Sequence, residues 1–271
     1  MTAAAEPVSA APRRWRKPPA IANRWLRWGL TLAALAYLVW GVADLEFDLD
    51  RIARGLPRAA DMLARMVPPD FARWDLLVEG MIESLQMAVI ATALGAVVSI
   101  PIGFGAASNV APAPVFWAMR GYIAVARTFP EVLIAIFLVK AFGFGTFAGL
   151  LTLFIASTGF IGKLLAEEIE AVDPGQVEAV RATGAGPAKV LLYGIAPQVM
   201  PRYVGLLVYR LDINLRESTI LGIVGAGGIG AVLYNAFSRY EYAFAAAILL
   251  SIIAVVLVGE WASGYVRRRI T

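Results

Sequence analysis

Five polar side chains interrupt an otherwise apolar stretch late in the chain. They are Arg210, Asp212, Asn214, Arg216 and Glu217. On a helix, the first, third and fifth share one stripe, while Asp212 and Arg216 form an i,i+4 pair beside it. Inserting one charged side chain at mid-bilayer costs at least about 2.5–3.5 kcal/mol of free energy. Five polar groups in one membrane segment therefore indicate a structural or functional role. Two interpretations stay open: pairing within a helical bundle, or lining of a transport path in which arginines donate hydrogen bonds to an anionic solute.

A glycine-rich run, GAGGIG, follows this polar group at residues 225–230. It formally matches the G-x-G-x-x-G pattern of dinucleotide sites, but that motif needs a preceding strand and a βαβ unit. The surrounding sequence is apolar and helical instead. We interpret the run as a flexible break at the outer end of a membrane helix, where a path opens. The predicted gate or hinge residues are Gly225, Gly227, Gly228 and Gly230.

A polar insert at residues 173–201 separates two apolar runs. Asp173 can cap a helix whose first residue is Pro174. Gln176 stands where its side chain can reach back to the amide of the cap. That helix is predicted to end at Gly184, because glycine readily takes the left-handed conformation of helix ends.

A second short helix is predicted from Pro187 to about Ile195, before Pro197 and Pro201 break the chain again. Two short helices joined at a glycine corner would project from a membrane-embedded body as a docking element. An ordinary polar loop between two membrane helices is the alternative.

The composition is that of an integral membrane protein. The 271 residues are 59% hydrophobic and 16% charged, against about 45–50% and 25% in soluble domains. Cysteine and histidine are absent, which excludes disulfides, thiolate or imidazole metal sites and triads built on either residue. The net charge of +4 does not argue for a nucleic-acid partner.

The apolar runs predict an all-α, polytopic bundle of about six membrane spans. The third span is expected to kink or restart at Pro130. The segment 57–67 is expected either to form a short helix on a membrane surface or to be a solvated loop. The predicted spans cover residues 28–43, 81–104, 115–142, 146–165, 202–224 and 242–265.

Four regions follow from these spans. They are a basic arm at 1–27, the first span with a periplasmic loop at 28–80, a membrane-embedded core at 81–265 containing the insert 173–201, and a basic tail at 266–271. Basic residues at both ends favour cytoplasmic termini, although the 44–75 loop also holds five arginines. An even number of spans places the insert on the same side as the termini.

The insert resembles the "EAA loop" of ABC-importer permeases. The match lies in Glu178 and Ala179, then Gly184, then Pro197. The resemblance implies a cytoplasmic loop whose short helices sit in a groove on an ATPase subunit. The residues it assigns to ATPase coupling are Glu178, Ala179, Gly184, Ala185 and Pro197.

A narrower resemblance covers residues 81–269. The segments NLREST-ILG-IVGAGGIG, ARTFPEVLIAIFLVKAFGFGTFAG and AVDPG make the chain similar to permeases of phosphonate/phosphite ABC importers. This resemblance implies a type I importer permease of the bacterial inner membrane, working by alternating access as a homodimer. Its expected partners are two ABC ATPase subunits, a periplasmic solute-binding protein, a second permease copy and the lipid bilayer.

No Walker A lysine loop is present, and the nearest look-alike, residues 159–163, has too short a spacing. We therefore expect no cofactor on this chain, with ATP and Mg²⁺ on the partner ATPase. Three alternatives stay open: a permease of this architecture for methionine or another amino acid, an ion-coupled carrier that protonates Asp212 or Glu217, and an intramembrane enzyme. The enzyme would use carboxylates from Glu83, Glu131, Asp212 and Glu217.

Overall fold

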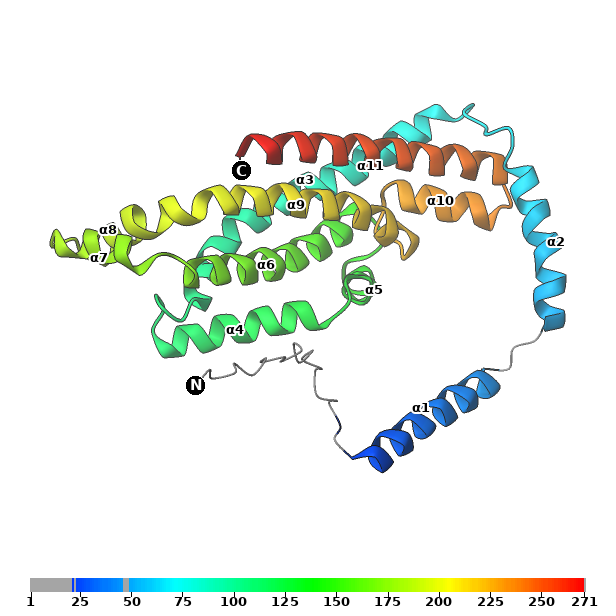
Figure 1. The fold of residues 1–271 in the computed structure, drawn as a ribbon. Coiled ribbons are helices and arrows are strands. Elements are labelled where there is room, and N and C mark those ends of the chain that lie inside the picture. Colours follow the sequence, from blue (N-terminus) through cyan, green and yellow to red (C-terminus); the bar gives the residue numbers. More distant parts are fainter. Residues whose placement is uncertain (1–20, 22, 46–48, 271) are drawn as a thin grey trace, which may run out of the picture. The chain divides into compact units, whose positions relative to one another are not determined.

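The structure is a computed structural model that describes residues 21, 23–45 and 49–270, with the side chains of 49 and 266–270 left out (Figure 1). Every regular element in these residues is helical, as the sequence predicts. The chain divides into two compact units, residues 1–60 and 61–271, which are described separately. Most of the predicted basic arm and the tail side chains lie outside the described residues.

The first unit contains α1 (Arg24–Asp44), which includes the predicted first span. The Asn23 side chain caps this helix by accepting hydrogen bonds from the amides of Trp25 and Leu26. The amphipathic helix α2 (Leu49–Arg65) begins in this unit and extends the short helix predicted over 57–67. Its apolar side chains Ile52, Leu56 and Leu63 are exposed.

The second unit is a bundle built on three long helices, α3, α6 and α9, which pack against one another. Small residues permit the close approach of α3 and α6, since a Cβ on Gly95 would lie 2.7 Å from that of Ser157. The remaining membrane helices pack around these three. The bounds are α3 (Trp74–Ala106), α4 (Ala113–Thr128), α5 (Glu131–Phe142), α6 (Thr146–Glu170), α9 (Ala196–Ile223), α10 (Gly228–Ser238) and α11 (Tyr242–Ile270).

Among the residues that the structure describes, five helical stretches are long and apolar enough to cross a membrane, and a sixth span is formed if α4 and α5 are taken together. The sequence predicts that the span over 115–142 kinks or restarts at Pro130, and the two helices meet at a bend of 90°. Pro130 explains the break, because it supplies no amide and confines Phe129 to an extended conformation, φ −88° and ψ 129°. The third span therefore restarts at this proline.

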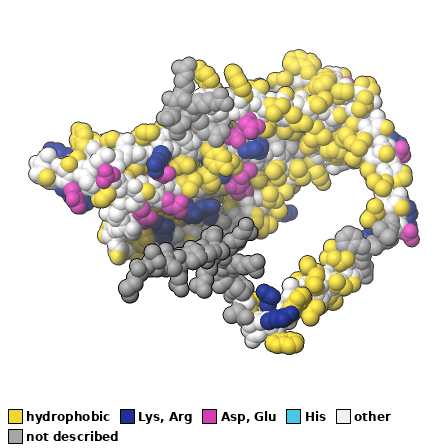
Figure 2. Space-filling view, in the orientation of Figure 1, with side chains coloured by type: hydrophobic (Ala, Val, Ile, Leu, Met, Phe, Trp, Pro, Cys, Tyr) yellow, Lys and Arg dark blue, Asp and Glu magenta, His cyan; other side chains and the backbone are white. Residues whose placement is uncertain are grey.

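The outer surface of the bundle is apolar where it faces away from the other helices. In Figure 2 the surface over α10 and the first half of α11 is almost entirely hydrophobic. Exposed apolar side chains also lie on α3 and α11. They include Val89, Leu94 and Val97 on α3, and Ile253, Leu257 and Val258 on α11. This surface suits contact with acyl chains.

The polar insert forms two short helices at one end of the bundle, α7 (Pro174–Ala182) and α8 (Pro187–Val190) (Figure 1). The Asp173 side chain caps α7 at the amide of Gly175, as predicted. Gln198, rather than the predicted Gln176, binds the amide of Asp173, at 2.9 Å. Gly184 has φ +77°, which confirms the predicted left-handed helix end.

The second short helix does not end before the prolines. It passes through a π-helical turn, η1 (Leu191–Ile195), directly into α9, so Pro197 and Pro201 lie inside a continuous helical stretch. The prediction of a break was wrong because the i→i+5 register before Pro197 accommodates its missing amide and its ring. The second short helix of the polar insert, α8, and the fifth span thus form one helical rod that contains a π-helical turn.

Candidate functional site: a charged cluster at the middle of the bundle

Arg210 is the centre of a buried polar cluster. Its Nη2 lies 3.0 Å from Oε1 of Glu131 and 3.2 Å from Oε2 of Glu217. Its Nε donates a hydrogen bond to Oγ of Ser157, at 3.0 Å. The Arg210 side chain is only 3% exposed. One guanidinium therefore holds carboxylates from α5 and α9 and a hydroxyl from α6.

Asn214, one turn along the same stripe of α9, extends the cluster to α3. Its Nδ2 donates to Oγ1 of Thr92 at 2.8 Å and to Oγ of Ser157 at 2.9 Å. The Asn214 side chain is fully buried. This amide therefore joins α3, α6 and α9 at one level, and buried polar contacts of this kind fix how helices register in a membrane.

The cluster lies at mid-length of the membrane helices. Thr92, Ser157 and Arg210 each stand close to halfway along α3, α6 and α9, and Glu131 begins α5 immediately after the break of the third span. Transport sites in membrane proteins characteristically lie near the midplane and use interrupted helices.

The second predicted pair on α9 is confirmed. Nη2 of Arg216 lies 2.6 Å from Oδ2 of Asp212, four residues earlier. The Arg216 side chain is 50% exposed, while that of Asp212 is 10% exposed. This pair therefore presents its cation, and not its carboxylate, to the surroundings of the bundle.

The predicted polar residues of α9 are thus paired within the bundle. Counting Glu131, the cluster and the neighbouring pair hold three carboxylates and two guanidiniums. Arg210 already donates from Nε and Nη2, which limits what it can offer an anion. A role of these five residues in lining a transport path remains a prediction.

An aromatic side chain, Phe160 of α6, lies beside the cluster and near two guanidiniums. The Cζ of Arg210 is 5.3 Å from the centre of its ring, and the Cζ of Arg127 is 5.9 Å from it. The ring of Tyr209 lies 6.0 Å from the same ring. Such distances permit cation–π attraction, which is stronger where water is excluded.

The sequence did not indicate Thr92, Ser157 or Phe160 as members of the site. Serine, threonine and phenylalanine are common in apolar helices, so none contrasts with its neighbours as a charged residue does. A search for hydroxyl side chains near the centres of the predicted spans would have found Thr92 and Ser157, because both stand at mid-helix.

The glycine run forms a packed corner between α9 and α10, at the end of the bundle opposite α7 (Figure 1). The amide of Gly145 donates to the carbonyl of Gly225, at 3.0 Å. The amide of Gly228 donates to Oε2 of Glu83, at 2.9 Å, so α3 caps the start of α10. Gly230 lies within α10, buried against α9. No strand precedes the run, which excludes the dinucleotide motif, and its action as a gate or hinge remains a prediction.

The four carboxylates considered for an intramembrane enzyme lie in three different places. Glu83 caps α10 at the outer corner, Glu131 and Glu217 share Arg210, and Asp212 pairs with Arg216. Each already binds a donor. They do not form one constellation for acid–base chemistry.

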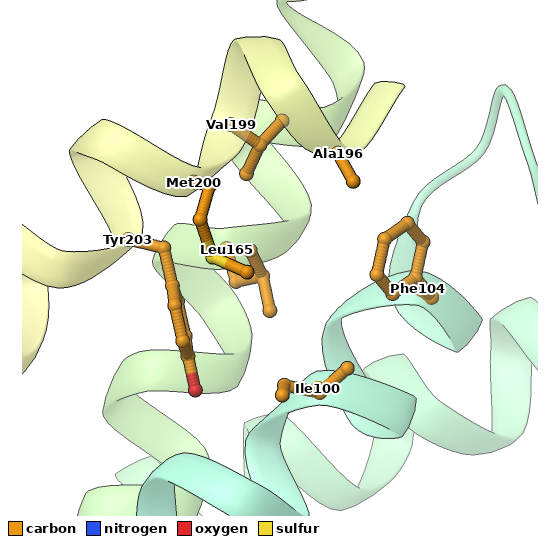
Figure 3. A pocket seen from close by; sticks show the side chains of 7 residues that line it. All are labelled: Ile100, Phe104, Leu165, Ala196, Val199, Met200 and Tyr203. Carbon is orange, nitrogen blue, oxygen red and sulfur yellow. The ribbon is translucent and has the colours of Figure 1, made fainter. Parts of the chain in front are cut away.

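An apolar pocket lies near the docking insert, between α3, α6 and α9 (Figure 3). Its lining side chains are Ile100, Phe104, Leu165, Ala196, Val199, Met200 and Tyr203. Its one polar group, the Tyr203 hydroxyl, donates to the carbonyl of Ala96 at 2.5 Å. A pocket with no free donor and no cation cannot bind an oxyanion.

The docking insert is anchored by few side chains and exposes the rest. Val177 and Val190 are buried in a cluster with Ile169 and Val199, which fixes α7 and α8 to the bundle. The predicted coupling residues are exposed except Ala185, which is half-buried: Glu178, Ala179, Gly184 and Pro197. The neighbouring Leu192 and Tyr193 are also exposed, as are Arg181 and Lys189, so the insert presents apolar side chains together with charges of both signs.

Comparisons with known proteins agree with this architecture. Residues 99–271 match a family described as "Binding-protein-dependent transport system inner membrane component". The chain is 39% identical over 250 residues to the phosphite transport system permease protein PtxC of Stutzerimonas stutzeri, covering 90% of each chain. It is 38% identical to the phosphate-import permease protein PhnE of Mycolicibacterium smegmatis, covering 92% of this chain and 47% of that protein, about half its length.

The fold is also that of a solved importer. A structure of the MetNI methionine ABC transporter in an inward-facing conformation matches with a TM-score of 0.66 at 21% identity. That match covers 74% of this chain and 99% of the other. A second relative, the probable D-methionine transport system permease protein MetI of Vibrio cholerae, is 28% identical over 211 residues, covering 72% of this chain and 92% of that protein.

Proposed function

The chain belongs to the family of binding-protein-dependent transport system inner membrane components, and we propose that its solute is a phosphorus oxyanion such as phosphite or a phosphonate. It is a permease subunit of an ABC importer and not an enzyme. The proposed solute follows from two relatives that are 39% and 38% identical to this chain, whose names specify phosphite and phosphate. An importer for methionine or another amino acid would share the fold.

The continuous helical rod from α8 through α9 is the observation that best supports coupled transport. It joins the exposed insert at Pro187 to the charged cluster at Arg210. At 1.5 Å per residue this rod spans about 35 Å, enough to reach from a membrane surface to the midplane. Movement of the insert would therefore be transmitted directly to the residues at the centre of the bundle.

The energy for this movement would come from partners. Two ABC ATPase subunits would bind ATP and Mg²⁺ and would also bind the insert. This chain would bind no cofactor. When the ATPases close on ATP, the insert would be drawn inward, and the bundle would rock from inward-open to outward-open. The π-helical turn at 191–195 is the joint that would absorb the change of angle.

The remaining features of the assembly follow from the same proposal. Both termini and the insert would face the cytoplasm, and a periplasmic binding protein would deliver solute near the α9–α10 corner. A second, identical copy would complete the path against the face that carries Arg210, Asp212, Asn214, Arg216 and Glu217. Gly225, Gly227, Gly228 and Gly230 would shape the outer gate.

Proteoliposomes that contain the chain, its ATPase and its binding protein test the solute. We expect ATP-dependent uptake of labelled phosphite or methylphosphonate, and no uptake without the ATPase. Excess unlabelled methionine should not compete. Uptake of methionine with no uptake of a phosphorus oxyanion would contradict the proposed solute.

The Gly184 corner gives a direct test of coupling. We expect Gly184→Val to uncouple ATP hydrolysis from uptake, because a β-branched residue at φ +77° is strained by at least about 1–2 kcal/mol. Gly186→Val is the matched control, since Gly186 has φ −68° and open space around it. Both uptake and ATP hydrolysis should be measured in the same vesicles. Coupled uptake by Gly184→Val at the control's rate would refute the coupling role of this corner.

A further inference from the structure

The amphipathic helix α2 (Leu49–Arg65) carries its large apolar side chains and its arginines on different sides. Ile52, Leu56 and Leu63 follow one stripe, because they stand four and seven residues apart. Four arginines follow a second stripe, at intervals of three, four and seven residues: Arg51, Arg54, Arg58 and Arg65. At about 100° per residue the two stripes are centred about 150° apart, on nearly opposite sides of the helix.

The apolar stripe of α2 is not covered by the bundle. Leu63 belongs to the same compact unit as the bundle and its side chain is still 59% exposed. Ile52 and Leu56, earlier in the helix, are exposed as well. The helix cannot hide this stripe by crossing the bilayer, since it has only 17 residues and six of them are charged. A continuous apolar stripe that faces outward indicates a surface that binds something else.

The segment that follows α2 is held to the start of α11, at the end of the bundle opposite α7 (Figure 1). The amide of Asp70 donates to the carbonyl of Ala243, at 2.9 Å. Nη2 of Arg73 lies 2.5 Å from Oε2 of Glu241, and Cζ of Arg73 lies 3.8 Å from the centre of the Phe244 ring. Because α11 is long and apolar enough to cross the membrane, this attachment marks the level at which that span leaves the bilayer.

Both ends of α2 are tethered close to a membrane surface. Leu49 follows Asp44, the last residue of the membrane helix α1, by five residues, and Arg65 precedes Asp70 by five. Five residues reach at most about 18 Å. The helix itself is about 25 Å long, at 1.5 Å for each of its 17 residues. An upright α2 would carry one end farther from the surface than its tether reaches, so the helix lies along the membrane.

We propose that α2 binds the phospholipid surface at the end of the bundle opposite the insert, with its apolar stripe among acyl chains and its arginines on anionic headgroups. A surface helix sinks its apolar face about 5–10 Å. A helix with its side chains is about 10–12 Å across, so the guanidiniums on the far side stay level with the headgroup phosphates. Four arginines and two aspartates give α2 a net charge of +2, which favours anionic lipids. This lipid site does not depend on which solute is transported.

Single cysteines in this cysteine-free chain test how α2 is oriented. The full chain, labelled with bimane at Leu56→Cys or at Arg58→Cys, is placed in nanodiscs of phosphatidylcholine and phosphatidylglycerol, which leave both membrane faces accessible. Lipids brominated on the acyl chain should quench the label at position 56 at least about threefold more than the label at 58, and aqueous iodide should show the reverse order. Val97→Cys, exposed on the span α3, and Ala188→Cys, exposed on the insert, give the reference values for lipid and water.

Bromination of one lipid at a time identifies the headgroup. Brominated phosphatidylglycerol should quench the label of Leu56→Cys about twofold more than brominated phosphatidylcholine does, and the label of Val97→Cys should show no such preference. Neutralising the basic stripe should abolish the preference at position 56 and leave the quenching itself. The neutral variant carries Arg51→Gln, Arg54→Gln, Arg58→Gln and Arg65→Gln. If it does not fold, as judged by size exclusion, Arg54→Gln/Arg58→Gln replaces it. A preference equal to that of the original arginines would contradict headgroup binding.

Four results at position 56 would overturn the lipid site. Iodide quenching equal to that of Ala188→Cys would show that the stripe is solvated. Shielding of positions 56 and 58 from both lipid and iodide would show that protein covers the helix, as a second copy of the chain would. Iodide quenching that disappears when the solute-binding protein is added would assign the stripe to that partner. Equal lipid quenching at positions 56 and 58 would exclude an oriented surface helix.

Discussion

Replacement of Arg210 by methionine is expected to destabilise the bundle by about 3–5 kcal/mol, the cost of leaving buried charge without its partner. The substitution removes the one cation within 4 Å of both Glu131 and Glu217. It also removes one of the two donors that now bind Oγ of Ser157, and Asn214 remains as the other. Thermal unfolding of the purified protein in mild detergent should show a large fall in the transition temperature and a low yield.

Two further variants identify the cause of that loss. The triple variant Arg210→Met/Glu131→Gln/Glu217→Gln should recover most of the stability, because a neutral buried group often replaces an ion pair at little cost. Lys163→Met removes an exposed i,i+4 pair with Glu167 and should cost only about 0.3–0.5 kcal/mol. A stable Arg210→Met, or a triple variant no better than it, would show that the cluster is not held by charge pairing.

Gly230→Ala is expected to prevent the close packing of α10 on α9. An added Cβ would overlap the carbonyl oxygen of Thr219, and a Cβ on the facing Gly222 would lie 2.6 Å from the backbone of the corner. Both obstacles are backbone atoms, which cannot move aside as a flexible side chain does. We expect a loss at or above the roughly 1–3 kcal/mol of ordinary overpacking, read as a fall in unfolding temperature.

Gly205→Ala is the matched control for this prediction. Gly205 lies within α9 and nothing would meet its Cβ within 4 Å. Alanine should leave stability unchanged or raise it by up to about 1 kcal/mol, from helix propensity. Equal stability of Gly230→Ala and Gly205→Ala would show that the corner can open without cost, in conflict with its packed geometry.

Much of the fold follows from local signals in the sequence. The apolar runs predict the spans, because each must satisfy its own backbone hydrogen bonds in lipid. Asp173 and Gly184 mark the ends of α7, since capping and left-handed termination depend on single residue types. The i,i+4 pair of Asp212 and Arg216 is also local, so spacing on one helix was enough to predict it.

The features that the sequence did not predict depend on contacts between distant segments. Proline alone does not reveal whether a π-helical turn will accommodate it, so the rod from Pro187 through Pro197 was missed. The partners of Arg210 on other helices, Ser157 and Glu131, lie 53 and 79 residues away from it in the sequence. Periodicity within one helix contains no information on such pairs. The position of Arg127 beside Phe160 likewise depends on the packing of α4 on α6.

We propose above that the polar insert faces the cytoplasm and binds a separate ATPase. The chain contains no cysteine, so a single Ala188→Cys variant can be labelled there and nowhere else; Ala188 is exposed on α8. A membrane-impermeant maleimide should label it in inside-out vesicles and not in intact spheroplasts, and added ATPase subunits should protect it. Labelling of intact spheroplasts, with no labelling of inside-out vesicles, would contradict a cytoplasmic position of the insert.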